Sequence, residues 1–514
     1  MAEGNLTAVD KRRPPRSRAA ASEPLCGVVT YQMMLLALAA ACCIALTCAC
    51  ADDVPAASAP EWVRALFSPT DARTALRLLQ AEEIEGGVEA ICEYQYPNIA
   101  GNPAKGKAKL FLPTTLATDN DARVPLMHFA GYELDRPGAA SFLARGIAAS
   151  TPCGEEFNPL VRGENVDIAI LHRVRALPFI DDARVEVFGG SAGGYMSLMV
   201  AAETFPLNCC APDVPPVNLG YNVGYLARNR GIAHAQPEGQ EHPNMPVVTV
   251  VTLLADQGRE IYGSDFDGDA YLAASPISRL DCITCPTLIT AVTADLLVPI
   301  NQIGVDLAKP LERSLFPDGF AIEMGDIISR DASQRTLVEA LGEGRLDVFT
   351  VPVPDDAPRM KWDGTAEEGQ APVLKTPFSE GEQFSLVVFD EGAPEPQCGH
   401  MKHAFGIDKG HFLDRYRDAR PGTDQLTLPK LTRLMQRYLH LEGFPALVRP
   451  PGSPAPFIAN RLDFPEAERA DVLRGLRTFA ADPDCLAKLR ALYAELPPEL
   501  KALGDGLYLG AAEH

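Results

Sequence analysis

The chain has 514 residues, of which 46% are hydrophobic, and its formal net charge is −22. A chain of this length and apolar content can bury a large core, which excludes a disordered protein. The acidic balance disfavours nucleic acid as a partner and is typical of a solvated surface.

The N-terminal 51 residues have the layout of an export signal, because basic side chains precede an apolar run over residues 33–51. Residues 49–51 (Ala-Cys-Ala) supply the small side chains of a cleavage site. Cys48 or Cys50 is the alternative, as a lipid attachment site of a bacterial lipoprotein. The run is also just long enough for an uncleaved anchor. We therefore expect an exported protein that is periplasmic, secreted or attached to the membrane through its N-terminus.

An even number of cysteines, eight, lies beyond residue 51, and in an exported chain this predicts disulfides without assigning their pairing. Cys282 and Cys285 do not form a redox motif, because they precede a strand and not a helix, and no second pair supports zinc. The eight are Cys92, Cys153, Cys209, Cys210, Cys282, Cys285, Cys398 and Cys485.

The central part of the chain begins after a Pro- and Ala-rich linker over residues 52–60. A short helix is expected next, followed by two antiparallel strands over residues 88–96 and 107–113. Beyond them, apolar runs of strand length alternate with helical segments. This alternation predicts an α/β fold with a doubly wound, mostly parallel sheet.

The most informative motif lies within residues 185–194, where an apolar β-rich run breaks into a serine flanked by glycines. Gly189 and Gly193 stand two residues before and after Ser191, and small residues there let the chain turn sharply from strand to helix. The helix expected over residues 192–203 would direct its amide groups towards the serine. The motif therefore predicts a nucleophile elbow with Ser191 as the nucleophile.

A serine nucleophile needs an acid and a base. In this arrangement of motifs the acid, and after it the base, follow the serine along the chain. A buried-strand run ends at Val292, and Asp295 stands just beyond it, where a carboxylate can orient an imidazole. The next strand, over residues 384–389, is followed by three histidines. His400 is the preferred base because it lies within a short loop of that strand, and His403 and then His411 are the alternatives.

These motifs together resemble the α/β-hydrolase superfamily, most closely its prolyl oligopeptidase-like and acyl-esterase branches. The resemblance also rests on residues 124–132, on Asn158-Pro159 with residues 177–182, and on residues 274–289, and it covers roughly residues 88–441. It implies an oxyanion hole made by the backbone amide of Ala192 and that of Tyr132, with Gly131 as the alternative second donor.

The resemblance implies a hydrolase domain over residues 52–441 and a C-terminal helical extension over residues 442–514. Cap-like insertions are expected at about residues 218–272 and 316–383, the second being either a cap element or a surface insertion. Helical apolar spacing recurs within the last ninety residues, over residues 426–441, 466–479 and 486–496.

The expected chemistry is a two-step acyl transfer through Ser191 that uses no cofactor and no metal. The acidic loop over residues 265–269 lacks the glycine position and the terminal glutamate of a calcium loop. An ester is the leading substrate class, because too few residues separate the signal from the core for a peptide-gating β-propeller. A serine peptidase acting on short peptides is the alternative, and a non-catalytic binding protein of the same fold is the third.

Overall fold

The computed structural model describes residues 59–67, 76–97, 103–119, 121–154, 165–234, 245–293, 295, 297–305, 324–342, 344–354, 356–357, 372–381, 383–390, 406–419, 421–435 and 466–496. The predicted export signal lies outside these residues. Among the helices of the described part, none is both long enough and apolar enough to cross a membrane.

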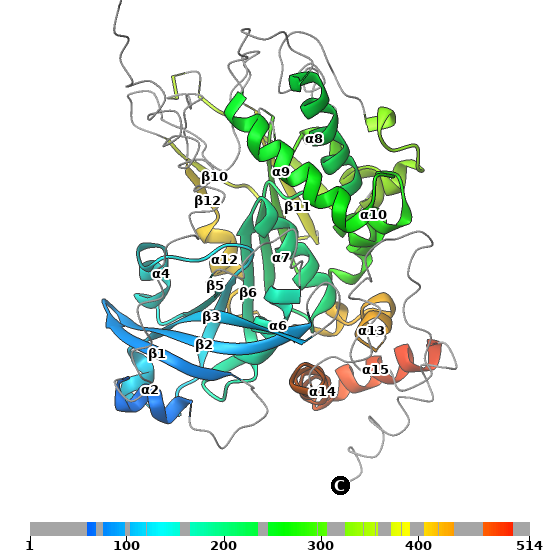
Figure 1. The fold of residues 1–514 in the computed structure, drawn as a ribbon. Coiled ribbons are helices and arrows are strands. Elements are labelled where there is room, and N and C mark those ends of the chain that lie inside the picture. Colours follow the sequence, from blue (N-terminus) through cyan, green and yellow to red (C-terminus); the bar gives the residue numbers. More distant parts are fainter. Residues whose placement is uncertain are drawn as a thin grey trace, which may run out of the picture. The chain divides into compact units, whose positions relative to one another are not determined.

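Ten strands of the described chain form one sheet, in which the first strands pair antiparallel and the strands from β5 to β9 run parallel. This confirms the predicted doubly wound, mostly parallel sheet, which Figure 1 shows at the centre of the molecule. In spatial order the strands are β1 (Arg77–Ile84), β2 (Gly87–Pro97), β3 (Pro103–Pro113), β5 (Ala148–Cys153), β4 (Val124–Phe129), β6 (Ile180–Gly190), β7 (Cys209–Asp213), β8 (Thr287–Val292), β11 (Phe384–Asp390) and β9 (Leu346–Pro352).

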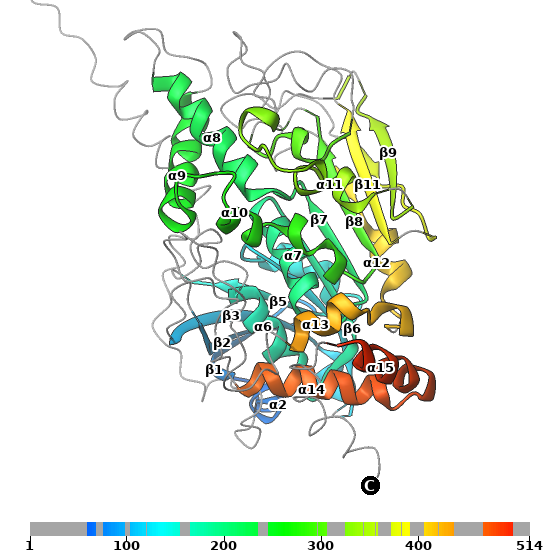
Figure 2. The same cartoon turned by 90° about the vertical axis from the view of Figure 1, so that its right-hand side faces the viewer.

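The two faces of the sheet are covered by different helices. Helices α6 (Asn165–Arg175) and α7 (Ala192–Glu203) cover one face, and α12 (Gly410–Tyr416) covers the other (Figure 1, Figure 2). Successive side chains of a strand point to opposite faces, so both faces of the parallel strands are apolar. On β7, Cys210 accordingly packs below α7 while Cys209 joins the cluster under α12.

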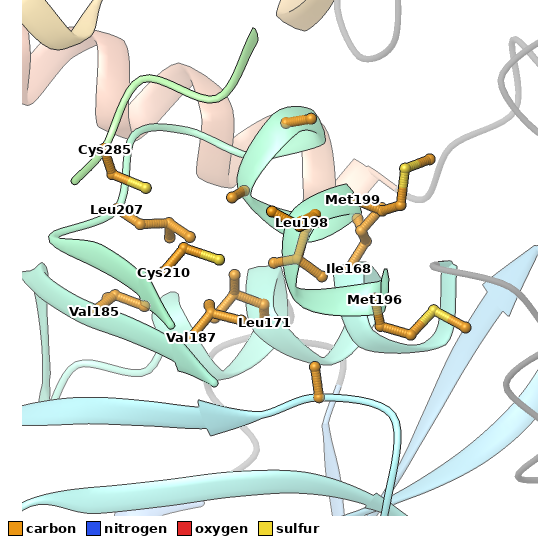
Figure 3. Close-up of a cluster of buried hydrophobic side chains, with 14 of the residues drawn as sticks. Ile168, Leu171, Val185, Val187, Met196, Leu198, Met199, Leu207, Cys210 and Cys285 are labelled. Carbon is orange, nitrogen blue, oxygen red and sulfur yellow. The ribbon is translucent and has the colours of Figure 1, made fainter. Parts of the chain in front are cut away.

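The core below α6 and α7 carries much of the stability of the fold. Leucine, valine and methionine side chains there are almost fully buried, and each contributes about 1.5–3 kcal/mol by leaving water. Figure 3 shows this cluster, with Ile168, Leu171, Val185, Val187, Met196, Leu198, Met199, Leu207, Cys210 and Cys285. Strand β6, which leads to Ser191, is therefore held rigidly by the close packing of this core below the turn.

The C-terminal end of α7 is neutralised by buried cations. Lys430, in α13 (Leu428–Leu434), donates hydrogen bonds to the carbonyls of Ala201 at 2.6 Å and Ala202 at 3.1 Å. Burial lowers the pKa of Lys430 to about 8. Glu203, the last residue of α7, is buried and pairs with Arg279 and Arg433. Positive charge at the C-terminal end of α7 offsets the negative end of the helix dipole. The positive end of the same dipole lies at Ser191.

The predicted cap segment after β7 is helical. It contains α8 (Leu219–His234) and α9 (Met245–Tyr262), which pack against one another, and α10 (Asp269–Ala274). Figure 1 shows α8 and α9 side by side. The described part of residues 316–383 contains α11 (Leu337–Leu341) and two strands. One strand is the sheet edge β9, and the other, β10 (Val373–Lys375), pairs in parallel with β12 (Gly406–Asp408).

The C-terminal extension contains the two predicted helices, α14 (Glu466–Ala480) and α15 (Pro483–Glu495). Helix α14 packs against α6 (Figure 1), where the buried His172 Nδ1 lies 2.7 Å from the Asp471 carboxylate. The ring of Phe479 packs edge-on against Phe205 at 6.4 Å. A buried histidine–carboxylate contact with α6 and an aromatic contact with Phe205, just beyond α7, thus attach the extension to the domain that carries Ser191.

No disulfide joins the seven described cysteines to one another, and Cys398 lies outside the described residues. The prediction is therefore wrong for these seven. Their positions explain why, since most of them are buried as small apolar side chains on strands or at helix ends. Burial raises the pKa of the Cys285 thiol to about 11, which makes it unreactive. An even count of cysteines contains no information about the distances between them.

The His172–Asp471 pair should make stability depend on pH. Burial alone would raise the pKa of Asp471, but the hydrogen bond from His172 and the charges of Arg175 and Arg474 hold it below its usual value of 3.8. A lowered carboxyl pKa stabilises the fold above the unfolded-state value, and that contribution is lost as the pH falls through the folded-state value. Asp471→Asn should therefore cost about 2 kcal/mol at pH 7 and progressively less below about pH 4.

The measurement is the free energy of unfolding of both proteins from pH 7 to pH 3. Asp281→Asn is the matched control, because the Asp281 carboxylate is 71% exposed and pairs with Arg345 on the surface. The control should lie within about 1 kcal/mol of the natural chain throughout. A difference between Asp471→Asn and the natural chain that stays constant down to pH 3 would contradict the assignment.

Candidate active site

Ser191 occupies a strained turn between β6 and α7. Its φ of 54° and ψ of −122° fall in a region that costs a residue with a side chain about 1–3 kcal/mol. Its amide donates to the carbonyl of Asp213 at 2.9 Å, and its own carbonyl accepts from the amide of Tyr195 at 3.0 Å. Only 8% of Ser191 is exposed. The strand, turn and helix of a nucleophile elbow are therefore present at the predicted residue.

The loop after β4 touches the elbow through glycines. A Cβ atom on Gly131, whose φ is +84°, would lie 2.1 Å from the Cα of Gly193. A Cβ on Gly193 would lie 2.3 Å from the carbonyl oxygen of Ala130. No side chain fits at either position, so the close approach itself requires both glycines. The contact brings Gly131, Tyr132 and Ala192 together beside Ser191, as the predicted oxyanion hole requires.

A buried polar network holds that loop in place. His128, fully buried on β4, donates from Nε2 to the Asp167 carboxylate at 3.1 Å, and its Nδ1 lies 2.9 Å from the Ser150 hydroxyl. The same Asp167 oxygen accepts the Gly131 amide at 3.2 Å. With Nε2 protonated, the neutral ring accepts the Ser150 proton at Nδ1. Because Asp167 engages the Gly131 amide, the geometry favours Tyr132 over Gly131 as the second oxyanion donor.

Tyr132 is fixed from the other side. The Thr151 hydroxyl donates to the Tyr132 carbonyl at 2.6 Å and lies 3.1 Å from the amide of Leu134. The peptide groups before Gly131 and after Tyr132 are therefore oriented by buried side chains of α6 and β5. This arrangement preorganises amide donors, which is the main requirement for stabilising a developing oxyanion.

Asp295 lies in a turn directly after β8 and is 5% exposed. Its Oδ1 accepts from the amides of Leu297 and Val298, both at 2.9 Å, which fixes the direction of the carboxylate. The sheet order β6, β7, β8 places this turn two strands from the elbow, which is about 10 Å at the usual strand spacing. A gap of that size leaves room for an imidazole between the two side chains.

His400 and His403 lie outside the described residues, so their assignment stays a prediction. Both flanks of their segment are described. Asp390, at the end of β11, accepts from the Thr293 hydroxyl at 3.4 Å and so lies beside the acid turn. Beyond the segment, the buried Lys409 donates to the carbonyls of Ala211 and Pro212 and pairs with the Asp213 carboxylate at 2.5 Å.

The contacts of Asp390 and Lys409 show where the described chain lies on either side of residues 391–405, which include His400 and His403. Strand β11, which precedes residues 391–405, ends next to the aspartate turn, and Lys409, which follows them, contacts the end of β7, whose Asp213 carbonyl accepts the Ser191 amide. Burial lowers the pKa of Lys409, although Asp213 partly offsets this. The third candidate, His411, is the second residue of α12, and its ring packs 5.3 Å from that of Phe378. Its Nδ1 is buried without a hydrogen-bond partner in the described part of the chain.

The described residues contain no group of three or more His, Cys, Asp or Glu side chains placed to hold a metal ion. In the acidic loop over residues 265–269, two of the three carboxylates are engaged by protein groups. Asp267 pairs with Arg330 at 3.3 Å and accepts the Ser329 amide, and Asp269 accepts from Arg330 at 2.6 Å. The loop is therefore tied to residues 329–330 by its own carboxylates.

Three residues of the site were missed by the sequence analysis: Asp167, Thr151 and Lys409. Asp167 offered a weak signal, since it is a carboxylate near the start of an apolar helix. Its partners His128 and Gly131 are 39 and 36 residues away along the chain. A single sequence does not connect positions that far apart.

No protein-family profile and no curated protein matches the chain. Similar solved structures include acetyl xylan esterase 1 from Thermoanaerobacterium, at 16% identity over 47% of this chain and 81% of that one, with a TM-score of 0.30. The esterase LipA from Xanthomonas oryzae gives 15% identity, 45% and 86% coverage, and a TM-score of 0.29. A puromycin hydrolase gives 19% identity over 45% of this chain and 33% of that one, with a TM-score of 0.28.

Similarities of this extent carry no argument about activity, and the fold follows from the topology of the chain itself. Antiparallel strands open the sheet, and the crossover order β5, β4, β6 leads to parallel strands that end in a strained serine turn and a buried aspartate turn. This chain has the α/β-hydrolase fold.

Proposed function

We propose that this protein is a serine hydrolase that cleaves carboxylic esters through an acyl-enzyme. The observation that carries the proposal is the strained, nearly buried Ser191 in contact with a loop whose amides are oriented by His128 and Asp167. Strain of this kind persists only where the surrounding structure enforces it, and it is concentrated at functional sites. The pattern supports catalysis more strongly than ligand binding alone.

In the proposed reaction the Ser191 hydroxyl attacks the ester carbonyl while a histidine accepts its proton. The amides of Ala192 and Tyr132 stabilise the oxyanion, and Asp295 orients the histidine and stabilises its charged form. The histidine then gives its proton to the departing alcohol. Water, activated by the same histidine, attacks the acyl group in the second half of the cycle. No cofactor takes part.

The proposed base is His400, with His403 and then His411 as alternatives. The described flanks support the first two, because Asp390 before them contacts the acid turn and Lys409 after them contacts the end of β7, the neighbour of β6. His411 instead lies within α12, where its ring packs against that of Phe378.

An ester is proposed as the substrate because an alcohol leaves more readily than an amine. Cleavage of an amide uses the same nucleophile, but the amine is a poorer leaving group and must be protonated as it departs. A peptidase acting on short peptides is the second candidate function. Export and attachment to a membrane through residues 1–51 are part of the proposal and rest on the sequence pattern alone, as does the absence of a nucleic-acid partner.

The test is covalent labelling with a fluorophosphonate combined with a substrate panel. The natural chain should be labelled and should hydrolyse acetyl to octanoyl esters far faster than matched aminoacyl amides. Ser191→Ala should lose labelling and about 10⁴-fold to 10⁶-fold of the turnover. Ser197→Ala is the matched control, because the Ser197 hydroxyl lies in the same helix and donates to the Gly193 carbonyl at 2.8 Å.

Two results would overturn parts of the proposal. Labelling that survives in Ser191→Ala would place the nucleophile elsewhere. Efficient amide cleavage that depends on Ser191, with feeble ester turnover, would replace the esterase with the peptidase. Alanine variants of His400, His403 and His411 in the same assay identify the base as the one whose loss resembles that of Ser191.

A second prediction concerns Asp167 as a positioning residue. Asn in its place supplies one neutral oxygen for the His128 and Gly131 donors, so the loop that carries the Tyr132 amide should lose orientation. Asp167→Asn should lower kcat for an activated ester about 10-fold to 100-fold and change KM little, because the oxyanion forms only in the transition state.

The control is Asp471→Asn in α14, where the carboxylate also pairs with a buried histidine of α6, His172, but makes no contact with the loop after β4. That variant should keep kcat although it loses stability. Equal kcat losses in both variants would show that Asp167 acts through stability alone.

A further inference from the structure

The strained turn at Ser191 has a counterpart at the end of the neighbouring strand β7. Among the described residues, Ser191 and Val214 are the ones other than glycine with a positive φ, and the φ of Val214 is 38°. A β-branched side chain is rare in this left-handed region, because its two branches crowd the backbone. Val214 directly follows β7 and is 3% exposed. The packing around it must therefore hold it in this conformation.

The peptide group between Asp213 and Val214 is held on both sides. Its carbonyl accepts the Ser191 amide at 2.9 Å, and its own amide donates to the carbonyl of Thr290 at 3.0 Å. The Asp213 side chain is fixed as well, because its Oδ1 accepts from the Thr290 hydroxyl at 2.5 Å and pairs with Lys409 at 2.5 Å. The backbone of Ser191 is therefore hydrogen-bonded to a peptide group that has little freedom to move.

The turn at Val214 brings the chain against the first turn of α7, which packs on β7 (Figure 2). A Cβ atom on Gly194 would lie 2.6 Å from the carbonyl oxygen of Asp213 and 3.1 Å from the Cβ of Pro215. The shorter distance leaves no room for a side chain, and its oxygen is the one that accepts the Ser191 amide. The elbow pattern includes a glycine two residues before and after the serine, so the contact and not the pattern explains this third glycine.

Close glycine contacts therefore reach the elbow from both neighbours of its strand. Strand β6 lies between β4 and β7 in the sheet. From the β4 side, Gly131 approaches Gly193, and from the β7 side, the Asp213 carbonyl approaches Gly194. A contact on one side alone would leave the start of α7 free to shift towards the other.

We propose that Val214 and Gly194 are positioning residues for the nucleophile. The Val214 side chain is buried in the apolar cluster under α12, whereas Pro215 lies against α7 on the opposite face of the sheet. The left-handed turn between them keeps the Asp213 carbonyl against Gly194, which fixes the backbone of Ser191. The kinetic part of this inference rests on the proposed function, and the contact itself does not.

The first variant of the full chain is Gly194→Ala. Alanine favours a helix more than glycine does, so a residue without a positioning role would tolerate this change. Here the added Cβ should push the Asp213 carbonyl away from the Ser191 amide. The kcat for 4-nitrophenyl acetate and the rate of fluorophosphonate labelling should both fall about 10-fold to 100-fold, with little change in KM, because the serine is displaced from its line of attack.

The second variant is Val214→Gly. Glycine adopts a positive φ without strain, but it has no side chain to anchor the turn. The same two rates should fall, and the double variant should lose no more than the worse single variant, because both changes act on one contact. Gly475→Ala in α14 is the matched control, since a Cβ there would lie 2.8 Å from the ring of Phe205, beyond the far end of α7. It should keep kcat although it also forces a close contact.

Hydrogen exchange of the Ser191 amide separates this inference from the proposed function. Measured by mass spectrometry on peptides that contain Ser191, exchange should be at least tenfold faster in Gly194→Ala and Val214→Gly than in the natural chain, whether or not the chain hydrolyses an ester. A natural chain that is not labelled would overturn the proposed function, and the exchange rates would then decide the inference. Unchanged exchange in both variants overturns it, as does a loss of kcat no larger than that of Gly475→Ala.

Discussion

The close contact between the elbow and the loop after β4 is the constraint on which the site depends. Gly131 and Gly193 approach so closely that neither tolerates a Cβ atom, and Ser191, two residues before Gly193, adopts a positive φ. Such a conformation is unfavourable in isolation and is maintained by the packing of β6 between its neighbours. The apolar core below α6 and α7 therefore sustains the strain that exposes a serine hydroxyl to the loop amides.

The buried polar groups include two histidine–aspartate pairs, and these pairs have different roles. Helix α6 carries Asp167, which orients the loop through His128 and Gly131, and His172, which attaches the C-terminal helices through Asp471. Both pairs are hydrogen-bonded inside the protein, where an unpaired partner would be costly. Only the first reaches the site, so one helix links the candidate catalytic centre to the extension.

Local patterns in the sequence predict the parts of the site that depend on neighbouring residues. The glycines around Ser191 require a turn, and an aspartate just after a buried strand predicts the position of Asp295; both turns are where they were expected. The antiparallel strands β2 and β3 and the helices α14 and α15 follow from their apolar spacing. The structure also contains β1 and β9, two edge strands that the sequence analysis did not predict. Their residues are largely exposed or half-buried, so burial imposes little apolar pattern on them.

The remaining features depend on contacts between distant positions. Asp167 acts on residues 36 and 39 positions earlier, and Lys409 joins the end of β7 across about two hundred residues. The cysteines show the same limit, because their number suggested bridges that the described cysteines do not form with one another. The choice between His400 and His403 remains a prediction, since both lie outside the described residues.

The most direct test of this account is a crystal structure of the chain after reaction with a fluorophosphonate. The account predicts a covalent bond from phosphorus to the Ser191 oxygen, with the phosphoryl oxygen about 2.7–3.1 Å from the amides of Ala192 and Tyr132. It also predicts the imidazole of His400 between that serine and Asp295. A phosphoryl oxygen that points to solvent, or a bond to another residue, would contradict the account.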